Sequence, residues 1–343
     1  MLYYYALLYY NINLKQINTM KKIHLISTLI GILAFSTISK ADLKVVTSIK
    51  PIHSLASYIM DGVGSPGLIV DGYNSPHNFQ LKPSHAKMLE QADIIFWVGE
   101  DLENFLEKPL DTIAKKAEKI ELLEIKGIKK LKFRERNIFE EHDDHGHDAK
   151  KEEHDDDDDH GHDAKKEEHD DHEGHGHGEY DPHIWLDPIN AKVILSEITE
   201  HLIENDSKNA STYKSNLAKA LVEIDKLIID VITETNTDLS YVVFHDAYQY
   251  YENRFNVNIL GAMTVNPDVM PGAEQIHEIH EVIEHDNVSC ILSEPQFNPD
   301  IIKSIAKDTN VKTGVLDPLG ANLKPGKDLY FDLIRNMSAS FNC

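Results

Sequence analysis

Apolar residues along the chain fall alternately into short continuous runs and into longer segments with helical spacing. Continuous runs are typical of buried strands, whereas spacings of three and four residues are typical of helices packed on one face. In the first half, the predicted strands are residues 43–48, 68–70 and 94–98, and the predicted helices are residues 51–60, 83–92 and a stretch at 102–117 interrupted near Pro109. This alternation predicts a parallel sheet covered on both faces.

Two long helical patterns follow, at residues 189–205 and 209–235, and the alternation then resumes. Further strands are predicted at residues 241–244, 257–260, 289–293 and 311–316, with helices at 273–285 and 300–308. A helix of about 25 residues is about 40 Å long, so we expect the second long helix to be a rigid connector. The fold class is therefore α/β, with two domains, 42–208 and 237–343, each a mainly parallel sheet flanked by helices, joined by a connector helix at 209–236.

Residues 140–179, called the His-rich tract here, have no hydrophobic periodicity, and we expect them to be disordered. They hold 19 acidic residues against four lysines, and a stretch that starts at His145 repeats at His160. Interleaved imidazoles favour Zn²⁺, Cu²⁺ or Ni²⁺ over hard cations, and each ion must order the chain around itself, so the sites should be weak. The auxiliary weak metal sites are His142, His145, His147, His154, His160, His162, His169, His172, His175 and His177. A plain spacer is the alternative. A long insertion normally leaves a domain from one surface site, so we expect its two ends to be close.

The beginning of the chain has the pattern of an export signal. Lys21 and Lys22 precede an apolar run at residues 23–38, and a small-x-small pattern ends at Ala41. The pattern predicts a signal peptide cleaved after Ala41, with the mature protein soluble in the periplasm; a retained membrane anchor is the alternative. Met20 stands where such a peptide begins, so residues 1–19 are expected to be an upstream extension.

Charge narrows the class of ligand. The formal net charge of −24 argues against nucleic acid and anionic membranes as partners and favours a cation. The sequence has no Gly-rich phosphate loop, no Gly-x-Ser-x-Gly, no His-Glu-x-x-His and no Cys-x-x-Cys. The two cysteines are Cys290, in an apolar run, and Cys343, the last residue. A disulfide and two unrelated thiols are both open at this point.

Ligand-type residues gather where predicted strands end. His245 follows one strand and Asp317 another, while His77 and His183 lie in loops beside the first sheet. In open α/β sheets ligands bind at the carboxyl ends of strands, and three imidazoles with one carboxylate suit tetrahedral Zn²⁺. Surface histidines are the alternative for each of them.

Two further acidic residues, Asp246 and Glu294, also lie at strand ends and are candidates to orient a ligand or its water. Structural hydrogen bonding is the alternative for both. Other histidines fall on helical patterns, where a solvated or capping role is expected; these are His53, His85, His201, His277, His280 and His285.

Several motifs resemble those of the metal-specific substrate-binding proteins of ABC transporters, and among them the zinc-binding, ZnuA-type members. The matching stretches are Ser-Ile-Lys-Pro-Ile-His-Ser at 48–54, Ser-Pro-His-Asn-Phe-Gln-Leu-Lys-Pro-Ser at 75–84, Asp-Pro-His-Ile-Trp-Leu-Asp-Pro at 181–188, Phe-His-Asp-Ala-Tyr at 244–248, Thr-Val-Asn-Pro at 264–267, Ser-Glu-Pro-Gln-Phe at 293–297 and Leu-Asp-Pro-Leu-Gly at 316–320. They occur in order along essentially the whole mature chain.

The resemblance implies a function and a set of ligands. The protein would capture Zn²⁺ in the periplasm as a monomer and pass it to the membrane permease of an ABC zinc importer, without enzymatic activity. His77, His183 and His245 would bind the metal, with Asp317 or water in the fourth position. The resemblance also implies a disulfide between Cys290 and Cys343. The chain departs from the pattern at Pro76, where some zinc-binding members have an acidic residue.

Two other functions are alternatives for the same residues. A zinc-dependent hydrolase could use a three-histidine site with a water in the open position, but it would also need a base and a substrate pocket. A passive metal buffer could act through the His-rich tract alone, but it would leave two well-patterned domains without a role.

Overall fold

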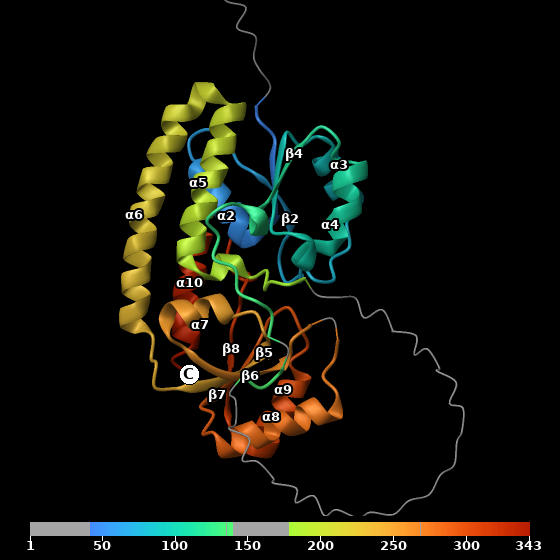
Figure 1. Ribbon diagram of the computed structural model, residues 1–343, viewed down its shortest axis with the longest axis vertical. Coiled ribbons are helices and arrows are strands. Elements are labelled where there is room, and N and C mark those ends of the chain that lie inside the picture. The colour runs from blue at the N-terminus through green and yellow to red at the C-terminus, as the bar shows by residue number, and fades with distance from the viewer. Residues whose placement is uncertain (1–41, 135, 140–177, 268) are drawn as a thin grey trace, which may run out of the picture. The chain divides into compact units, whose positions relative to one another are not determined.

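The computed structural model describes residues 42–134, 136–139, 178–267 and 269–343, of which Leu43–Cys343 form one compact unit (Figure 1). The predicted signal peptide within residues 1–41 and the ten histidines of the His-rich tract lie outside these residues. Among the helices that are described, none is both long and apolar enough to cross a membrane.

The first half builds one parallel sheet, in the strand order β2-β1-β3-β4. Its elements are β1 (Val45–Ile49), α2 (Lys50–Ile59), β2 (Gly67–Val70), α3 (Pro83–Glu90), β3 (Ile94–Trp97), α4 (Glu100–Thr112) and β4 (Glu118–Glu121). The central strands β1 and β3 are buried along their whole length, as continuous apolar runs predict. We call this sheet, the helices α2 to α4 and the later helix α5 (Pro188–Asn205) the N-lobe.

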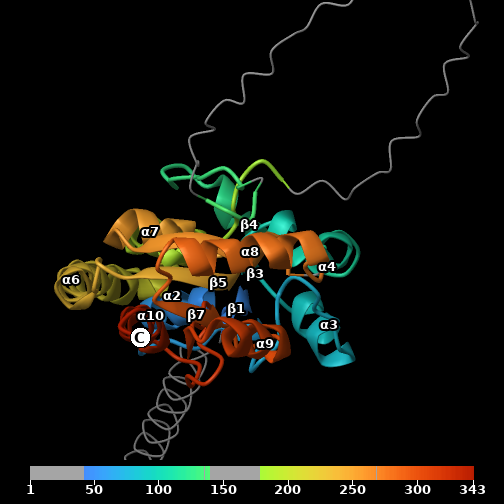
Figure 2. The same cartoon turned by 90° about the horizontal axis from the view of Figure 1, so that it is seen from below.

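A second parallel sheet follows, in the order β6-β5-β7-β8. Its elements are β5 (Ser240–His245), α7 (Gln249–Phe255), β6 (Asn258–Thr264), α8 (Ala273–His285), β7 (Cys290–Ser293), α9 (Asp300–Thr309) and β8 (Lys312–Val315). Figure 2 shows α8 and α9 on opposite faces of this sheet. We call this sheet with α7, α8 and α9 the C-lobe, and the two sheets confirm the predicted fold class.

Three helices connect the lobes. α5 (Pro188–Asn205) starts at a proline behind an Asp187 cap that accepts a hydrogen bond from the Ile189 amide at 2.9 Å. The 25-residue α6 (Ala210–Glu234) runs beside α5, which confirms the predicted long helix (Figure 1). The last helix, α10 (Leu329–Ser340), packs against α2 of the N-lobe and against α6, so the end of the chain returns from the C-lobe to the N-lobe. The boundaries 42–208, 209–236 and 237–343 stay a prediction.

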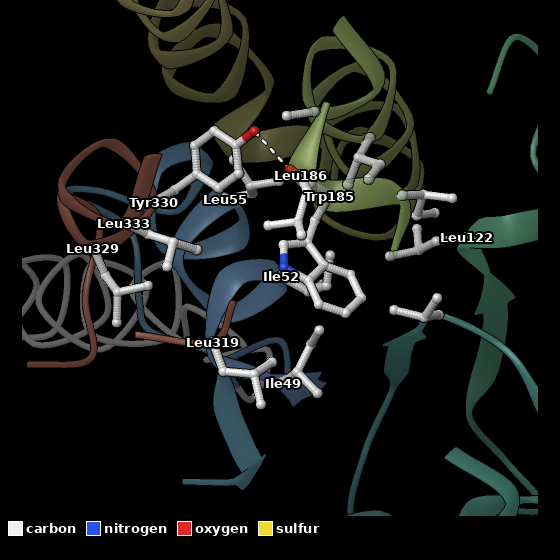
Figure 3. Packing of buried hydrophobic residues seen from close by; sticks show 14 of the residues in the cluster. Ile49, Ile52, Leu55, Leu122, Trp185, Leu186, Leu319, Leu329, Tyr330 and Leu333 are labelled. Carbon is white, nitrogen blue, oxygen red and sulfur yellow. Dashed lines mark hydrogen bonds between the residues drawn. The ribbon is translucent and has the colours of Figure 1, made fainter. Parts of the chain in front are cut away.

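A shared core lies where these helices meet. The indole of Trp185 and the ring of Tyr330 are fully buried, among aliphatic side chains of α2, α10 and the short helix η2 (Ile184–Leu186) (Figure 3). Trp185 Nε1 donates to the Pro318 carbonyl at 2.8 Å, and the Tyr330 hydroxyl donates to the Trp185 carbonyl at 2.8 Å. These bonds fix the segment that follows His183.

Three features differ from the sequence prediction. The helix at 100–112 does not break at Pro109, which lies inside it; the non-helical residue is Glu103, at φ −118° and ψ 50°. The strand β4 and the helices α7 and α10 were not predicted. In contrast, the disulfide between Cys290 and Cys343 is present, with a Cα–Cα distance of 6.4 Å, and this prediction is confirmed.

Candidate metal site

Three imidazoles from separate segments meet between the lobes. His77 lies in the loop after β2, His183 directly precedes η2, and His245 is the last residue of β5. One ligand atom of each lies within 4.8 Å of the other two. His77 and His245 follow strands of the two different sheets, and the carboxyl ends of such strands are where open α/β sheets bind ligands.

The spacing of these rings suits a small tetrahedral ion. The Nε2 atoms of His183 and His245 are 3.3 Å apart, and the ring centroid of His77 lies 5.5 Å from that of His183 and 5.6 Å from that of His245. With Zn–N bonds of about 2.0–2.1 Å, two ligands of a tetrahedral Zn²⁺ are about 3.3–3.4 Å apart. The His183–His245 pair therefore already has the separation that Zn²⁺ requires.

A carboxylate orients each of the two buried rings. The Nδ1 atom of His183 lies 2.7 Å from Asp181 Oδ1, and the Nδ1 atom of His245 lies 2.6 Å from Glu294 Oε1. When Nδ1 carries the proton and donates it to the carboxylate, the Nε2 lone pair is left for a metal. Both rings are thus held in the orientation of a ligand.

Burial and neighbouring charge act differently on the two rings. Burial, and then the neighbouring His245, holds the pKa of His183 well below its usual value of 6.5. Burial is the largest single influence on His245 and lowers its pKa, but the carboxylates of Glu294, Asp246 and Asp181 together raise the pKa above its usual value. Burial raises the pKa of Asp181 to about 7, and its Oδ2 has no hydrogen-bond partner among the described residues. Carboxylates held in so dry a place favour a divalent cation.

The cavity at these rings is small, with a volume of about 10 Å³. It is lined by Ser75, Pro76, His77, His183, Trp185, His245, Glu294, Gln296, Phe297, Pro318 and Leu319. About one water-sized sphere fits such a volume. The site can therefore hold an ion, but not an organic molecule beside it.

Asp317 is not part of the group of converging ligand atoms among the residues that the structure describes. Its carboxylate accepts four hydrogen bonds: Oδ1 from the amides of Leu319 and Gly320 and from the Gln296 side chain, and Oδ2 from the amide of Ala321. From the other side, the ammonium of Lys50 donates to the carbonyls of Gly320, Ala321 and Leu323 at 2.6–3.0 Å. In this structure Asp317 shapes the loop that carries Pro318 and Leu319.

The two acidic residues that were candidates to orient a ligand, Asp246 and Glu294, make different contacts. Glu294 contacts His245 directly, as described above. Asp246 instead accepts a hydrogen bond from Arg134 at 2.9 Å, and Arg134 also donates to Glu252 at 2.8 Å. Burial raises the pKa of Asp246 to about 6, against the opposing charge of Arg134.

Sequence reasoning did not single out three residues that shape this site: Asp181, Lys50 and Arg134. For Asp181 a signal was present, since a carboxylate two residues before His183 can reach both its amide and its ring. The contacts of Lys50 and Arg134 span 270 and 112 residues of sequence, respectively, so no local pattern indicated them.

Comparison with known proteins identifies the family. The model of the family described as ZnuA, zinc-uptake complex component A, periplasmic, matches residues 45–342. The chain belongs to this family. Among curated relatives, the high-affinity zinc uptake system protein ZnuA of Brucella abortus (strain 2308) is 48% identical over 301 residues, which cover 86% of this chain and 90% of that protein. The ZnuA protein of Yersinia pestis is 36% identical over 312 residues, covering 88% and 91%.

Solved structures share the fold of this ZnuA family member. A crystal structure of ZnuA matches with a TM-score of 0.67 at 20% identity, covering 88% of this chain and all of that one. A manganese-bound periplasmic metal-binding protein from Candidatus Liberibacter asiaticus matches with a TM-score of 0.64 at 20% identity, covering 87% and 97%. This chain therefore shares its fold with both of these proteins.

Proposed function

We propose that this protein captures Zn²⁺ in the periplasm between its two lobes and delivers it to the membrane permease of an ABC zinc importer. The main support is the 3.3 Å separation of the His183 and His245 Nε2 atoms, each on a ring oriented by a carboxylate. Membership in a family of periplasmic zinc-uptake components supports the same function. The ion is cargo, so the site must bind it without chemical change.

The ligands in this proposal are His77, His183 and His245, with water in the fourth position. Asp317 would have to give up four hydrogen bonds to reach the ion. His77 is only half-buried, whereas His183 and His245 are buried, so water reaches the ion from the His77 side. Three imidazoles also favour Zn²⁺ over Mn²⁺, which prefers oxygen ligands.

Capture fits the cavity better than hydrolysis does. A zinc hydrolase needs a substrate beside the metal-bound water, and a cavity of about 10 Å³ has no room for one. Zinc-loaded protein should therefore hydrolyse test esters no faster than a variant without the metal site.

The experiment that tests the proposal is calorimetric titration of the metal-free protein with Zn²⁺ and with Mn²⁺. We expect one tight Zn²⁺ site and weaker binding of Mn²⁺. Replacing His245 with Ala should weaken the tight site by about tenfold or more, because one of three protein ligands is lost while the core is unchanged. The matched control is His277→Ala, on the exposed face of α8, which should leave the tight site as it is. Tight binding that survives His245→Ala would exclude His245 as a ligand.

A further inference from the structure

A second group of metal-ligating side chains lies in the N-lobe, outside the cleft. Glu118, at the start of β4, and His201 and Glu204, near the end of α5, each place one ligand atom within 4.8 Å of the other two. His201 lies 13 residues beyond Pro188, or about 20 Å along α5 at the helical rise per residue. The group is therefore separate from the zinc site, which lies at the other end of this helix.

The imidazole of His201 is arranged as the rings in the cleft are. Its Nε2 atom lies 3.2 Å from Glu197 Oε1, one helical turn earlier, so a carboxylate orients one side of the ring. The Nδ1 atom faces Glu118 Oε1 at 2.8 Å. A ring with one nitrogen on a carboxylate and the other facing further ligand atoms is the arrangement of metal-bound histidines.

The contact between His201 Nδ1 and Glu118 Oε1 does not have the geometry of a hydrogen bond. Nδ1 is buried and has no hydrogen-bond partner among the described residues, although the Glu118 oxygen is only 2.8 Å away. If both atoms bound one ion through bonds of about 2.1 Å, a ligand–metal–ligand angle of roughly 85° would place them at this separation. The pair is therefore spaced as neighbouring ligands of one cation.

Two further features favour a cation here. The Asn205 side chain donates to Glu118 Oε2 at 2.9 Å, which fixes this carboxylate and leaves Oε1 for an ion. The last turn of α5 carries no basic residue, although the C-terminal end of a helix carries partial negative charge and attracts cations.

We propose that Glu118, His201 and Glu204 form a second divalent-cation site, with Glu197 orienting the imidazole. One imidazole with two carboxylates and ligand angles near 90° suit an open, roughly octahedral site that takes Zn²⁺ or Mn²⁺. Glu118 and Glu204 are partly or fully exposed and must be ordered by the ion, so this site binds more weakly than the cleft. A bound ion ties the edge strand β4 to the end of α5.

The test uses the full-length protein with one equivalent of Zn²⁺ in the cleft, to which Mn²⁺ is then added. Paramagnetic broadening of amide NMR signals reports which residues lie near the added ion. We expect broadening at Lys119 and Leu202, which flank the proposed ligands. In Glu118→Gln and His201→Gln, the Mn²⁺ concentration that halves these signals should rise about tenfold or more. The matched control is His277→Gln, whose ring pairs with Glu281 on the exposed face of α8 and should behave as the wild type does.

Glu118→Gln changes a side chain that is only partly buried, so it keeps the test decisive if His201→Gln unfolds the helix end. Crystals soaked in Zn²⁺ give a second measurement, an anomalous peak between Glu118 and His201. Broadening that is unchanged in both variants would overturn the proposal, since the ion would then be held by general surface charge. Absence of both the broadening and the peak would equally overturn it.

Discussion

At the scale of single residues, the cleft depends on pairs in which a carboxylate orients an imidazole. Asp181 reaches His183 from two residues away, whereas Glu294 reaches His245 from the position directly after the neighbouring strand β7. A carboxylate behind a ligand increases the basicity of the ring and fixes its tautomer. Asp181 and Glu294 should therefore contribute to zinc affinity without touching the ion.

Replacing Glu294 with Gln tests this role. Gln keeps an oxygen that can accept from His245 Nδ1 but removes the negative charge, so we expect zinc affinity to fall by about tenfold. Competition titration against a chelator of known affinity measures the change. Glu281→Gln, in the exposed pair with His277, is the control and should leave affinity unchanged. An affinity for Zn²⁺ equal to that of the wild type would show that the charge of Glu294 is not needed.

A second residue-scale prediction concerns Glu103, which is fully buried in the N-lobe. Its Oε2 accepts from the amides of Val98 and Gly99 at 2.9 and 3.0 Å, and burial raises its pKa to about 7 despite these bonds. The folded state binds the proton of the Glu103 carboxyl more tightly than the unfolded state does. The contribution of this group to the free energy of unfolding is therefore fully present at low pH. It is lost as the pH rises from about 4.3 toward 7.

Glu103→Gln should remove this pH dependence, because the amide oxygen can accept the same two hydrogen bonds without ionising. At pH 8 the variant should be more stable than the wild type by on the order of 3 kcal/mol, and near pH 4 the two should be similar. Chemical denaturation of both metal-free proteins across this range measures the difference. A constant difference at every pH would mean that Glu103 keeps its ordinary pKa.

The sequence allowed prediction of the residues whose chemistry is visible in short motifs, and not of those defined by long-range contacts. His77, His183 and His245 stand in loops or at a strand end, where the carboxyl edges of parallel strands place ligands. Asp317 stands in an equally suitable position, after β8. Its oxygens are nevertheless occupied by backbone amides of its own turn, and only the loop conformation shows that.

At the scale of elements, pattern reasoning found those with strong apolar periodicity and missed those without it. The strand β4 has the sequence Glu-Lys-Ile-Glu, with only Ile120 fully buried, because it is an edge strand of its sheet. The helix α7 has only seven residues, too few for a periodic pattern to stand out. The helix is kinked at Glu103, whose side chain accepts hydrogen bonds from two backbone amides. A hydrophobicity pattern shows neither the kink nor these hydrogen bonds.

One irregular segment also leads from the N-lobe to the C-lobe sheet. We call residues 132–134 and 136–139 the strap. Its end pairs antiparallel with β6: the Ala262 amide donates to the Asn137 carbonyl at 2.8 Å, and the Phe139 amide donates to the Leu260 carbonyl at 2.8 Å. Gly261 permits this approach, since a Cβ there would lie 2.7 Å from the Asn137 oxygen. The strap covers the edge of the C-lobe sheet, which limits pairing with other chains.

Arg134 fixes the strap beside the metal site. It binds Asp246, the residue after His245, and Glu252, and its guanidinium lies 3.8 Å from the ring of Phe139. Arg134→Met should leave both carboxylates buried without a cation, which destabilises the fold by about 3 kcal/mol or more. It should also speed zinc release, because the end of β5 loses its anchor. Denaturation and stopped-flow release into a chelator measure the two effects.

The control for this prediction is Arg254→Met. Arg254 binds both oxygens of Asp187 at 2.7 and 2.8 Å and is exposed to a similar degree, 28% against 24% for Arg134. Asp187 caps α5 and does not adjoin a ligand, so this variant should lose stability but release zinc at the wild-type rate. Equal release rates in the two variants would mean that Arg134 serves stability alone.

At the scale of the whole molecule, the two roots of the His-rich tract lie on different lobes. Phe139 is held on β6 of the C-lobe, while the amide of Gly178 donates to Asp101 of α4 in the N-lobe at 2.9 Å. The two ends of the tract are thus held by different lobes, whereas the sequence predicted that they leave from one surface site. The carbonyl of Glu179 accepts a hydrogen bond from the amide of Phe133, so these two residues are adjacent. From Phe133 the strap then leads to the C-lobe.

This arrangement determines how the tract can be removed to separate its metal binding from that of the cleft. Six residues lead from Phe133 to Phe139, a span of up to about 20 Å in extended chain, so joining residue 139 directly to residue 178 should pull the strap off β6. A flexible Gly/Ser linker of about ten residues in place of residues 140–177 should keep both roots in place.

With this linker, we expect the protein to lose several weak zinc sites and to keep one tight site whose Kd is within a few fold of the wild-type value. The ligands proposed in the cleft are ordered by folding, whereas each ion in the tract must organise the chain around itself. Calorimetry on the wild type, the linker variant and the direct join measures the number of sites and their affinities. The direct join, with its strap displaced beside Asp246, should bind the tight ion less well than the linker variant does. If the tight phase instead disappears in the linker variant, the tract holds the tightly bound zinc, and a metal buffer replaces cleft capture as the function.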